Sequence, residues 1–216
     1  MTHPTTFAGT LIIARHHESE WNKKGLWTGS RDVHLTPYGL QKSEEMGALI
    51  KDLPPDYAFA SGQVRTDETL EAMFKALGIE FIDGESSPAL NERDYGDYTG
   101  KNKWEVEKAI GEEAFEHMRR DWDYPIPHGE TLKIVYGRIV PFYLKSIVPL
   151  LKEGHRVLVV SHGNALRALT MYIESVPPDR APDVEMPFGS VVLYRVGKDG
   201  KVQHKEVRTV GGKVNA

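Results

Sequence analysis

Apolar residues occur along the chain in short runs that alternate with longer amphipathic stretches. Short strands are predicted at residues 11–14, 57–61 and 79–82, and the unbroken β-branched run within 156–161 is typical of a central parallel strand. Residues 37–50, 64–77 and 164–173 place apolar side chains on one side, which predicts helices. This alternation indicates an α/β fold: a three-layer sandwich with a mostly parallel central sheet flanked by helices.

The remaining segments carry weaker patterns. Residues 83–130 are long and polar, with helices predicted near 103–110 and 112–121, and such a segment suggests an active-site cover at about 95–130. Residues 131–151 are predicted to be mostly helical, although Pro141 implies a kink. Strands around 191–194 and 202–207 flank a turn at 198–200, which predicts a hairpin.

Composition narrows the class of protein. The 216 residues, 40% of them hydrophobic and 27% charged, suit a single globular domain spanning 1–216. The absence of cysteine excludes disulfides and thiolate catalysis, so a covalent intermediate must use another residue. A net charge of −4 gives no reason to expect nucleic acid or membrane as a partner. No apolar run approaches the roughly 20 residues that span a bilayer, so we expect a cytoplasmic protein.

Polar side chains follow three of the predicted strands. Arg15 and His16 end the first, Arg65 follows the second, and His162 follows the central one. Because the carboxyl ends of parallel strands meet at one edge of a sheet, these side chains can converge on one crevice. Arginine forks match two phosphate oxygens, and helix N-termini favour anions. The sequence therefore predicts a phosphate pocket.

His16 is the candidate nucleophile within this pocket. A neutral imidazole could attack phosphorus if a backbone carbonyl held its other nitrogen, with the charge of the transition state falling on Arg15, Arg65 and His162. Taken alone, however, a histidine at a strand end is more often a surface or capping residue. The longer motifs around it decide between these interpretations.

Residues 15–22 (R-H-H-E-S-E-W-N) resemble the signature R-H-G-E-S-E-W-N of the cofactor-dependent phosphoglycerate mutases, within the histidine phosphatase superfamily. The resemblance extends from residue 11 to about 207. It includes residues 26–29 (L-W-T-G), 35–39 (L-T-P-Y-G), 90–97 (L-N-E-R-D-Y-G-D), the pair Arg119-Arg120 and residues 161–169 (S-H-G-N-A-L-R-A-L). The chain is thus similar to the mutases more narrowly than to histidine phosphatases at large.

The resemblance implies an enzyme of glycolysis and gluconeogenesis that interconverts 3-phosphoglycerate and 2-phosphoglycerate through a phosphohistidine at His16. Its cofactor would be 2,3-bisphosphoglycerate, which primes His16, and no metal is implied. Glu92 would be the general acid and base. The catalytic set would be completed by Arg15, Arg65 and His162. The rest of the ligand would be bound by Ser19, Asn22, Thr28, Gly29, Tyr95, Lys103, Arg119, Arg120, Gly163 and Asn164. Family members form dimers or tetramers, so a homodimer or homotetramer is expected.

The chain departs from the family pattern at a few positions. His17 replaces the glycine after the nucleophile, where histidine would disfavour a positive φ and could crowd the phosphate. His128 replaces a glycine in P-x-G-G-E-S, and residues 62–67 differ from A-L-x-R-A-x while keeping Arg65. These changes leave two alternatives open: a phosphatase that transfers the group to water, and a catalytically retired member that acts as a binding or regulatory protein.

Overall fold

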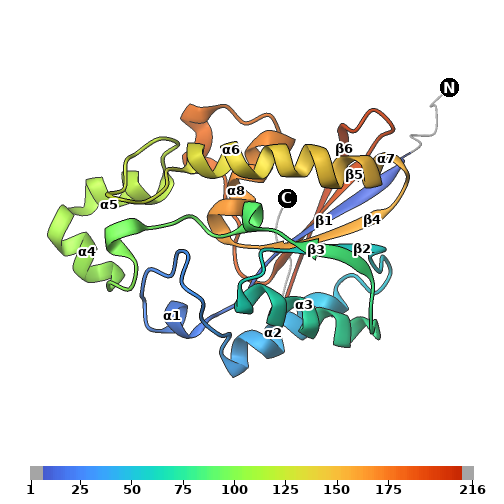
Figure 1. Cartoon of the computed structure of the whole chain (residues 1–216), viewed down its shortest axis with the longest axis horizontal. Coiled ribbons are helices and arrows are strands. Elements are labelled where there is room, and N and C mark those ends of the chain that lie inside the picture. Colours follow the sequence, from blue (N-terminus) through green and yellow to red (C-terminus); the bar gives the residue numbers. More distant parts are fainter. Residues whose placement is uncertain (1–6, 211–216) are drawn as a thin grey trace.

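A computed structural model of the chain describes residues 7–210. Its sheet has the strand order β3-β2-β4-β1-β5-β6 (Figure 1). The strands β3, β2, β4 and β1 run parallel to one another, whereas β5 pairs antiparallel with both β1 and β6. The strand bounds are β1 Gly9–Arg15, β2 Tyr57–Ala60, β3 Asp83–Ser86, β4 Arg156–Ser161, β5 Ser190–Val196 and β6 Val202–Thr209. The mostly parallel sheet and the hairpin are confirmed.

Helices cover both faces of the sheet (Figure 1). Their bounds are α1 Glu20–Lys23, α2 Pro37–Ala48, α3 Val64–Leu77, α4 Lys103–Ile110, α5 Glu112–Arg120, α6 Leu132–Phe142, α7 Val148–Lys152 and α8 Gly163–Ile173. Alternate residues of β1 explain the layers. Ile13 belongs to a core cluster shared with α6 and α8, whereas Ile12 belongs to a second cluster with Met46 of α2 and Met73 of α3. The predicted three-layer sandwich is therefore confirmed.

The predicted cover, residues 95–130, lies at the end of the sheet where β1 and β4 finish (Figure 1). Helices α4 and α5 lie where they were predicted, and they pack on a third apolar cluster that includes Trp27, Tyr95 and Phe115. Asn102 starts α4 by accepting hydrogen bonds from the amides of Trp104 and Glu105. The polar segment thus contains its own hydrophobic base, which holds it as a defined wall.

Some local predictions were wrong. The strand expected at residues 79–82 lies instead at 83–86, as edge strand β3, whose four residues are all exposed. Backbone hydrogen bonds to β2 form this strand, so no apolar pattern marks it. A Cβ at Gly84 would lie 1.6 Å from the Ala58 carbonyl oxygen, which explains the glycine. Leu40, expected on the apolar side of α2, is exposed. Helix α1 and the 3₁₀ helix η4 (Pro178–Asp183) were not predicted.

The long helix after the cover is irregular at the predicted place. Pro141 lies inside α6 and is followed by a π-helical stretch, Tyr143–Ile147, before α7 begins. The continuous helical segment Leu132–Lys152 has 21 residues, and an 18-residue stretch of it has a mean hydropathy of 1.4, so by length and composition alone it could cross a membrane. Lys133, Arg138 and Lys145 interrupt it, so it is not the uninterrupted apolar run that the sequence was searched for. Leu132, Val135 and Ile139 are fully buried against the sheet, as in a core helix.

Candidate active site

His16 follows directly after β1 and is almost fully buried. Its backbone amide donates to the Ser161 carbonyl of β4 at 3.0 Å, which fixes its position at the strand end. The ring Nδ1 lies 2.7 Å from the carbonyl oxygen of His17, to which it donates. Burial, reinforced by Arg65 and Arg15, holds the pKa of His16 well below its usual value. The ring is therefore neutral, and Nε2 keeps the lone pair that a nucleophile needs. The predicted hydrogen bond between the His16 ring and a backbone carbonyl is confirmed.

Arg15 lies beside His16 in a tight slot. Its Nη1 donates to the Met186 carbonyl at 2.7 Å, and its guanidinium carbon stands 3.9 Å from the centre of the Phe188 ring. A Cβ at Gly163 would come within 3.2 Å of the same carbon, so glycine lets the arginine pack against the start of α8. The buried Nε has no partner among the described residues and is free for an anion.

Arg65 reaches the pocket from the first turn of α3, with no exposed surface. Carbonyl oxygens hold its guanidinium: Nη1 donates to Arg31 at 2.8 Å and Nη2 donates to Gly29 at 2.9 Å. Burial lowers its pKa to about 10, so it stays positive at neutral pH. No carboxylate within the described part of the chain forms an ion pair with it. Its charge therefore remains available to a bound anion.

His162 stands directly behind the nucleophile, with its ring centre 5.0 Å from that of His16. A chain of hydroxyl groups fixes its tautomer. The Thr66 hydroxyl donates to the Gln63 carbonyl at 2.8 Å, so the Ser61 hydroxyl, 2.7 Å away, must donate to Thr66. The His162 Nε2, 2.8 Å from Ser61 Oγ, must then carry a hydrogen and donate. Its buried Nδ1, which has no partner in residues 7–210, then carries the lone pair.

Glu92 is held at the N-terminus of α8. Its Oε1 accepts from the amide of Arg93 at 2.7 Å and from the amide of Asn164 at 3.2 Å, where the helix dipole favours a negative charge. Its own amide donates to Gln63 Oε1 at 3.2 Å. These contacts orient the carboxylate and leave Oε2 without a hydrogen bond to any described residue. The carboxylate can therefore exchange a proton with a substrate oxygen.

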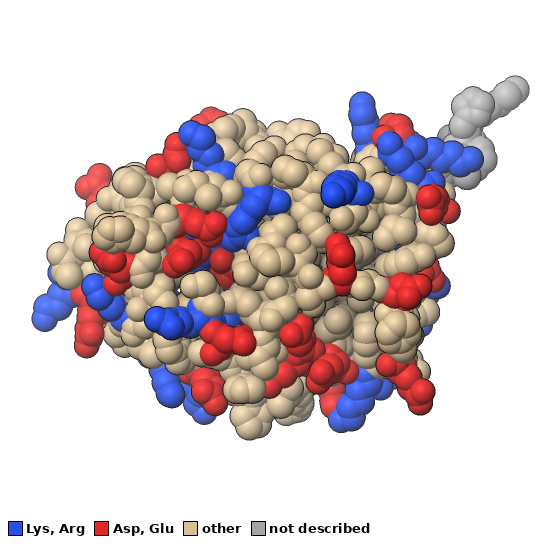
Figure 2. Space-filling view, in the orientation of Figure 1, with Lys and Arg blue, Asp and Glu red and all other residues tan. Residues whose placement is uncertain are grey.

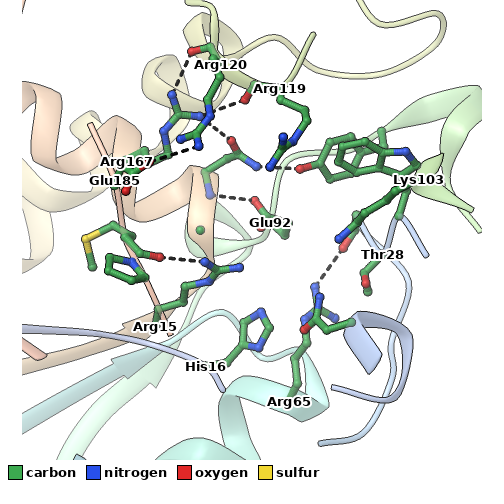
Figure 3. A pocket seen from close by; sticks show the side chains of 18 residues that line it. Arg15, His16, Thr28, Arg65, Glu92, Lys103, Arg119, Arg120, Arg167 and Glu185 are labelled. Carbon is green, nitrogen blue, oxygen red and sulfur yellow. Dashed lines mark hydrogen bonds and ion pairs between the residues drawn. The ribbon is translucent and has the colours of Figure 1, made fainter. Parts of the chain in front are cut away.

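A second group of cations faces the pocket from the cover (Figure 3). Lys103, at the start of α4, has its ammonium 5.3 Å from the Trp27 ring centre, and burial together with Arg15 and Arg119 lowers its pKa. Arg119 and Arg120 end α5; the first pairs with Glu116 at 2.5 Å and the second with Glu185 at 3.1 Å. This group lies on the side of the pocket away from His16, which suits a ligand with two anionic ends.

The structure brings most of the predicted site residues into one cavity. Ser19 is an exception, because it caps α1 by accepting from the Asn22 amide instead of lining the cavity. His162 lies behind the wall. The lining residues are Arg15, His16, Asn22, Trp27, Thr28, Gly29, Arg65, Glu92, Tyr95, Lys103, Arg119, Arg120, Gly163, Asn164, Arg167, Glu185, Met186 and Pro187.

Several lining residues were not predicted. Trp27 and Arg167 belong to motifs quoted in the sequence analysis, but neither was given a part in the site. The third omission is the segment 185–187, which lines the cavity. Its contribution includes a backbone carbonyl, so side-chain chemistry offers no signal. Residue 167 carried a weak signal, because a charged residue inside an otherwise apolar helix is seldom buried without a purpose.

The two unusual histidines lie outside the cavity. His17 has no positive φ; its ring lies 5.4 Å from the ring centres of Tyr38 and Phe188, and its Nδ1 accepts from the Glu18 amide. Its side chain does not line the phosphate pocket, so His17 does not crowd a bound phosphate as the sequence suggested it could. His128 does adopt a left-handed φ of 56°, the conformation that favours glycine.

Comparisons with known proteins agree with this geometry. The model of the histidine phosphatase superfamily (branch 1) matches residues 11–207, and the chain belongs to that family. Solved structures of similar fold include Bacillus stearothermophilus YhfR, with a TM-score of 0.78 and 28% identity over 91% of this chain and 95% of that one. An α-ribazole phosphatase from Shigella flexneri, 20% identical with a TM-score of 0.76, shares the fold over 96% of this chain and 100% of its own.

Relatives with higher sequence identity to this chain bear a more specific name. A protein of Chelativorans sp. (strain BNC1) named 2,3-bisphosphoglycerate-dependent phosphoglycerate mutase is 40% identical over 202 residues, which cover 93% of this chain and 98% of that protein. A protein of the same name from Rhodopseudomonas palustris (strain BisB18) is 41% identical over 90% of this chain and 95% of its own. Among the described residues, no group of three or more His, Cys, Asp or Glu side chains is arranged to hold a metal ion.

Proposed function

We propose that the chain is a phosphoglycerate mutase that interconverts 3-phosphoglycerate and 2-phosphoglycerate through a phosphohistidine at His16. The observation that carries this proposal is the second cation group, Lys103, Arg119 and Arg120, placed across the cavity from His16 (Figure 3). A ligand whose only anion is the transferred phosphoryl group needs only the residues around His16. A phosphoglycerate also carries a carboxylate, and its bisphosphorylated form carries a further phosphate, which the second group can bind.

The reaction follows from the positions of these side chains. Phosphorylated His16 would pass its phosphoryl group to the free hydroxyl of the phosphoglycerate, so that an O–P bond forms as the N–P bond breaks. Nε2 of His16 would then attack the other phosphate ester, so that an N–P bond forms as that P–O bond breaks. Arg15 and Arg65 stabilise the charge that builds up on the phosphoryl oxygens. Glu92 would take the proton from the hydroxyl that accepts the phosphoryl group, and would return it to the oxygen that departs when His16 is phosphorylated again.

The buried donors also suit a priming ligand. Arg15 Nε, Arg65 Nε and Thr28 Oγ1 are buried without partners among the described residues, in side chains that line the cavity, and they match the oxygens of a polyanion. When bound, 2,3-bisphosphoglycerate supplies the phosphoryl group that charges His16 at the start. The cover keeps water from the charged histidine, because α4 and α5 close one side of the cavity above an apolar base.

A coupled mutase assay tests this proposal. We expect conversion of 3-phosphoglycerate that is stimulated by 2,3-bisphosphoglycerate and unaffected by EDTA. His16→Ala should abolish acid-labile phosphate incorporation, and labelling that survives on His17 would sink the assignment. Release of inorganic phosphate without isomerisation would indicate a phosphatase. No activity at high protein concentration, with ligand still bound, would indicate a retired binding protein.

The arginines at the end of α5 give a sharper test of the mutase over the phosphatase. Both side chains are about one-third exposed and pair with surface carboxylates, so replacing them by alanine costs the fold little. Each charged hydrogen bond to the ligand contributes roughly 1.5 to 3 kcal/mol. We therefore expect Arg119→Ala with Arg120→Ala to weaken 3-phosphoglycerate binding by roughly 10²-fold or more. A cytoplasmic location, a part in glycolysis and gluconeogenesis, and a homodimeric or homotetrameric state remain predictions.

A further inference from the structure

Every N–H group of the Arg167 guanidinium donates a hydrogen bond inside the protein. It lies in the middle of α8 and is 6% exposed. Its Nε donates to the Val184 carbonyl, Nη1 donates to the Arg119 carbonyl and to Asn164 Oδ1, and Nη2 donates to the carbonyls of Arg120 and Ala181, all at 2.8 to 3.1 Å. Five donors thus meet five acceptors, which is the full capacity of an arginine. None of these acceptors is a carboxylate.

The two carbonyls at Arg119 and Arg120 matter most. They end α5, and the last carbonyls of a helix have no partner within that helix. A positive group at this end also interacts favourably with the negative pole of the helix dipole. Arg167 therefore fixes the backbone from which both cations of the second group project. Figure 3 shows this fan of hydrogen bonds between α8 and the end of α5.

The other three acceptors belong to the same wall. The carbonyls of Ala181 and Val184 fix the segment that leads to Met186, whose own carbonyl holds Arg15. Asn164 is oriented so that its Nδ2 donates to the Tyr95 hydroxyl at 2.8 Å. A single side chain thus joins the cover, the 181–184 segment and the start of α8.

We propose that Arg167 is a positioning residue that sets the distance between the phosphoryl site at His16 and the second cation group. This inference rests on the proposed function for the nature of the ligand. Arg167 has no donor left for substrate, so it acts through Arg119, Arg120 and Asn164. Lysine cannot replace it, since an ammonium has three donors at one point and cannot span five acceptors. Its buried charge without a carboxylate partner would be a poor choice for packing alone.

Substrates with one and with two anionic ends separate this role from a general structural one. In Arg167→Lys we expect kcat/KM for 3-phosphoglycerate to fall by roughly tenfold to a hundredfold, mainly through KM, because misplacement by about 1 Å has effects of that size. Hydrolysis of p-nitrophenyl phosphate, which has no second anion, should change less than about threefold. Arg167→Met, which fills the volume without the charge, should lose more with the first substrate and again little with the second.

The matched control is Arg208→Lys. Arg208 also holds a backbone carbonyl, that of Leu49, but it lies on β6 and does not line the cavity. It should change neither substrate's kinetics. Equal losses for both substrates in Arg167→Lys and Arg167→Met would mean a merely structural role, and unchanged KM in both would also overturn the inference.

Amide hydrogen exchange provides a readout that needs no substrate. Arg167→Lys should speed exchange in α5 while leaving α2 and α3 as in the wild type. If the wild-type protein proves not to be a mutase but exchange in α5 still accelerates, the proposed function fails and the positioning role stands. If exchange in α5 is unchanged, the positioning role fails whatever the enzyme catalyses.

Discussion

The two buried histidines make the stability of the protein depend on pH. His16 and His162 are neutral in the folded chain because burial, with Arg65 as the next contributor, pushes the pKa of each well below 6.5. Well above pH 6.5 both rings are neutral in the folded and unfolded states, so they cause no pH dependence there. Below it, the unfolded chain binds protons that the folded chain does not, and the free energy of unfolding falls as pH falls.

The size of the effect follows from the number of protons. One proton bound on unfolding corresponds to about 1.4 kcal/mol per pH unit, so two histidines give a slope of up to about 2.7 kcal/mol per pH unit. Between pH 7.5 and 5.0 the loss amounts to up to about 4 kcal/mol, a large share of the stability of a typical domain. The slope ends where the folded chain itself begins to take up protons.

Urea unfolding in phosphate-free buffer measures this slope. Phosphate must be absent because an anion that binds the folded site would add stability of its own. The control is the double variant His16→Asn with His162→Asn, which retains every carboxylate and the other histidines. Between pH 7.5 and 5.0, the free energy of unfolding of this variant should fall by up to about 4 kcal/mol less than that of the wild-type protein. Parallel curves for the two proteins would refute the claim that both rings are held neutral.

Smaller substitutions test other features. His128→Gly should raise the free energy of unfolding by about 1 kcal/mol in urea titrations, because a non-glycine residue at φ 56° is strained and its exposed ion pair contributes little; a decrease would contradict this. Glu185→Gln should lower KM for 3-phosphoglycerate several-fold by freeing Arg120, and a rise in KM would count against it. Gly163→Ala should lower kcat with little change in unfolding midpoint, since the added Cβ displaces Arg15.

Much of the fold was predictable because its local signals agree. The helix predicted at 64–77 and the strand at 156–161 have the observed bounds. In the first case Gly78 takes the left-handed conformation that ends the helix, and in the second every side chain from Val157 to Ser161 is buried. The convergence of Arg15, Arg65 and His162 followed from the common direction of parallel strands. In these elements the local sequence pattern and the packing of the folded protein favour the same residues.

Other features depend on contacts between distant segments. Strand β3 is formed by backbone hydrogen bonds at an edge, where no side chain is buried, so periodicity misplaced it by four residues. The role of Arg167 depends on carbonyl groups, which every residue carries and no motif reveals. His17 was judged by its side chain, whereas its contribution to the site is the carbonyl that holds the nucleophile's ring.

The partners of the arginines explain how a chain with a net charge of −4 can bind a strong anion. On the face shown in Figure 2, acidic and basic side chains are interspersed. Away from the cavity, Arg156 and Arg208 pair with the carboxylates of Asp56 and Asp52. Around the cavity, Arg15, Arg65 and Arg167 are held by carbonyl oxygens instead. A carbonyl dipole orients a guanidinium without cancelling its charge, whereas a carboxylate would cancel it. The net charge of the whole chain therefore says little about the phosphoryl site, where the positive charges of Arg15 and Arg65 are left for the ligand to neutralise.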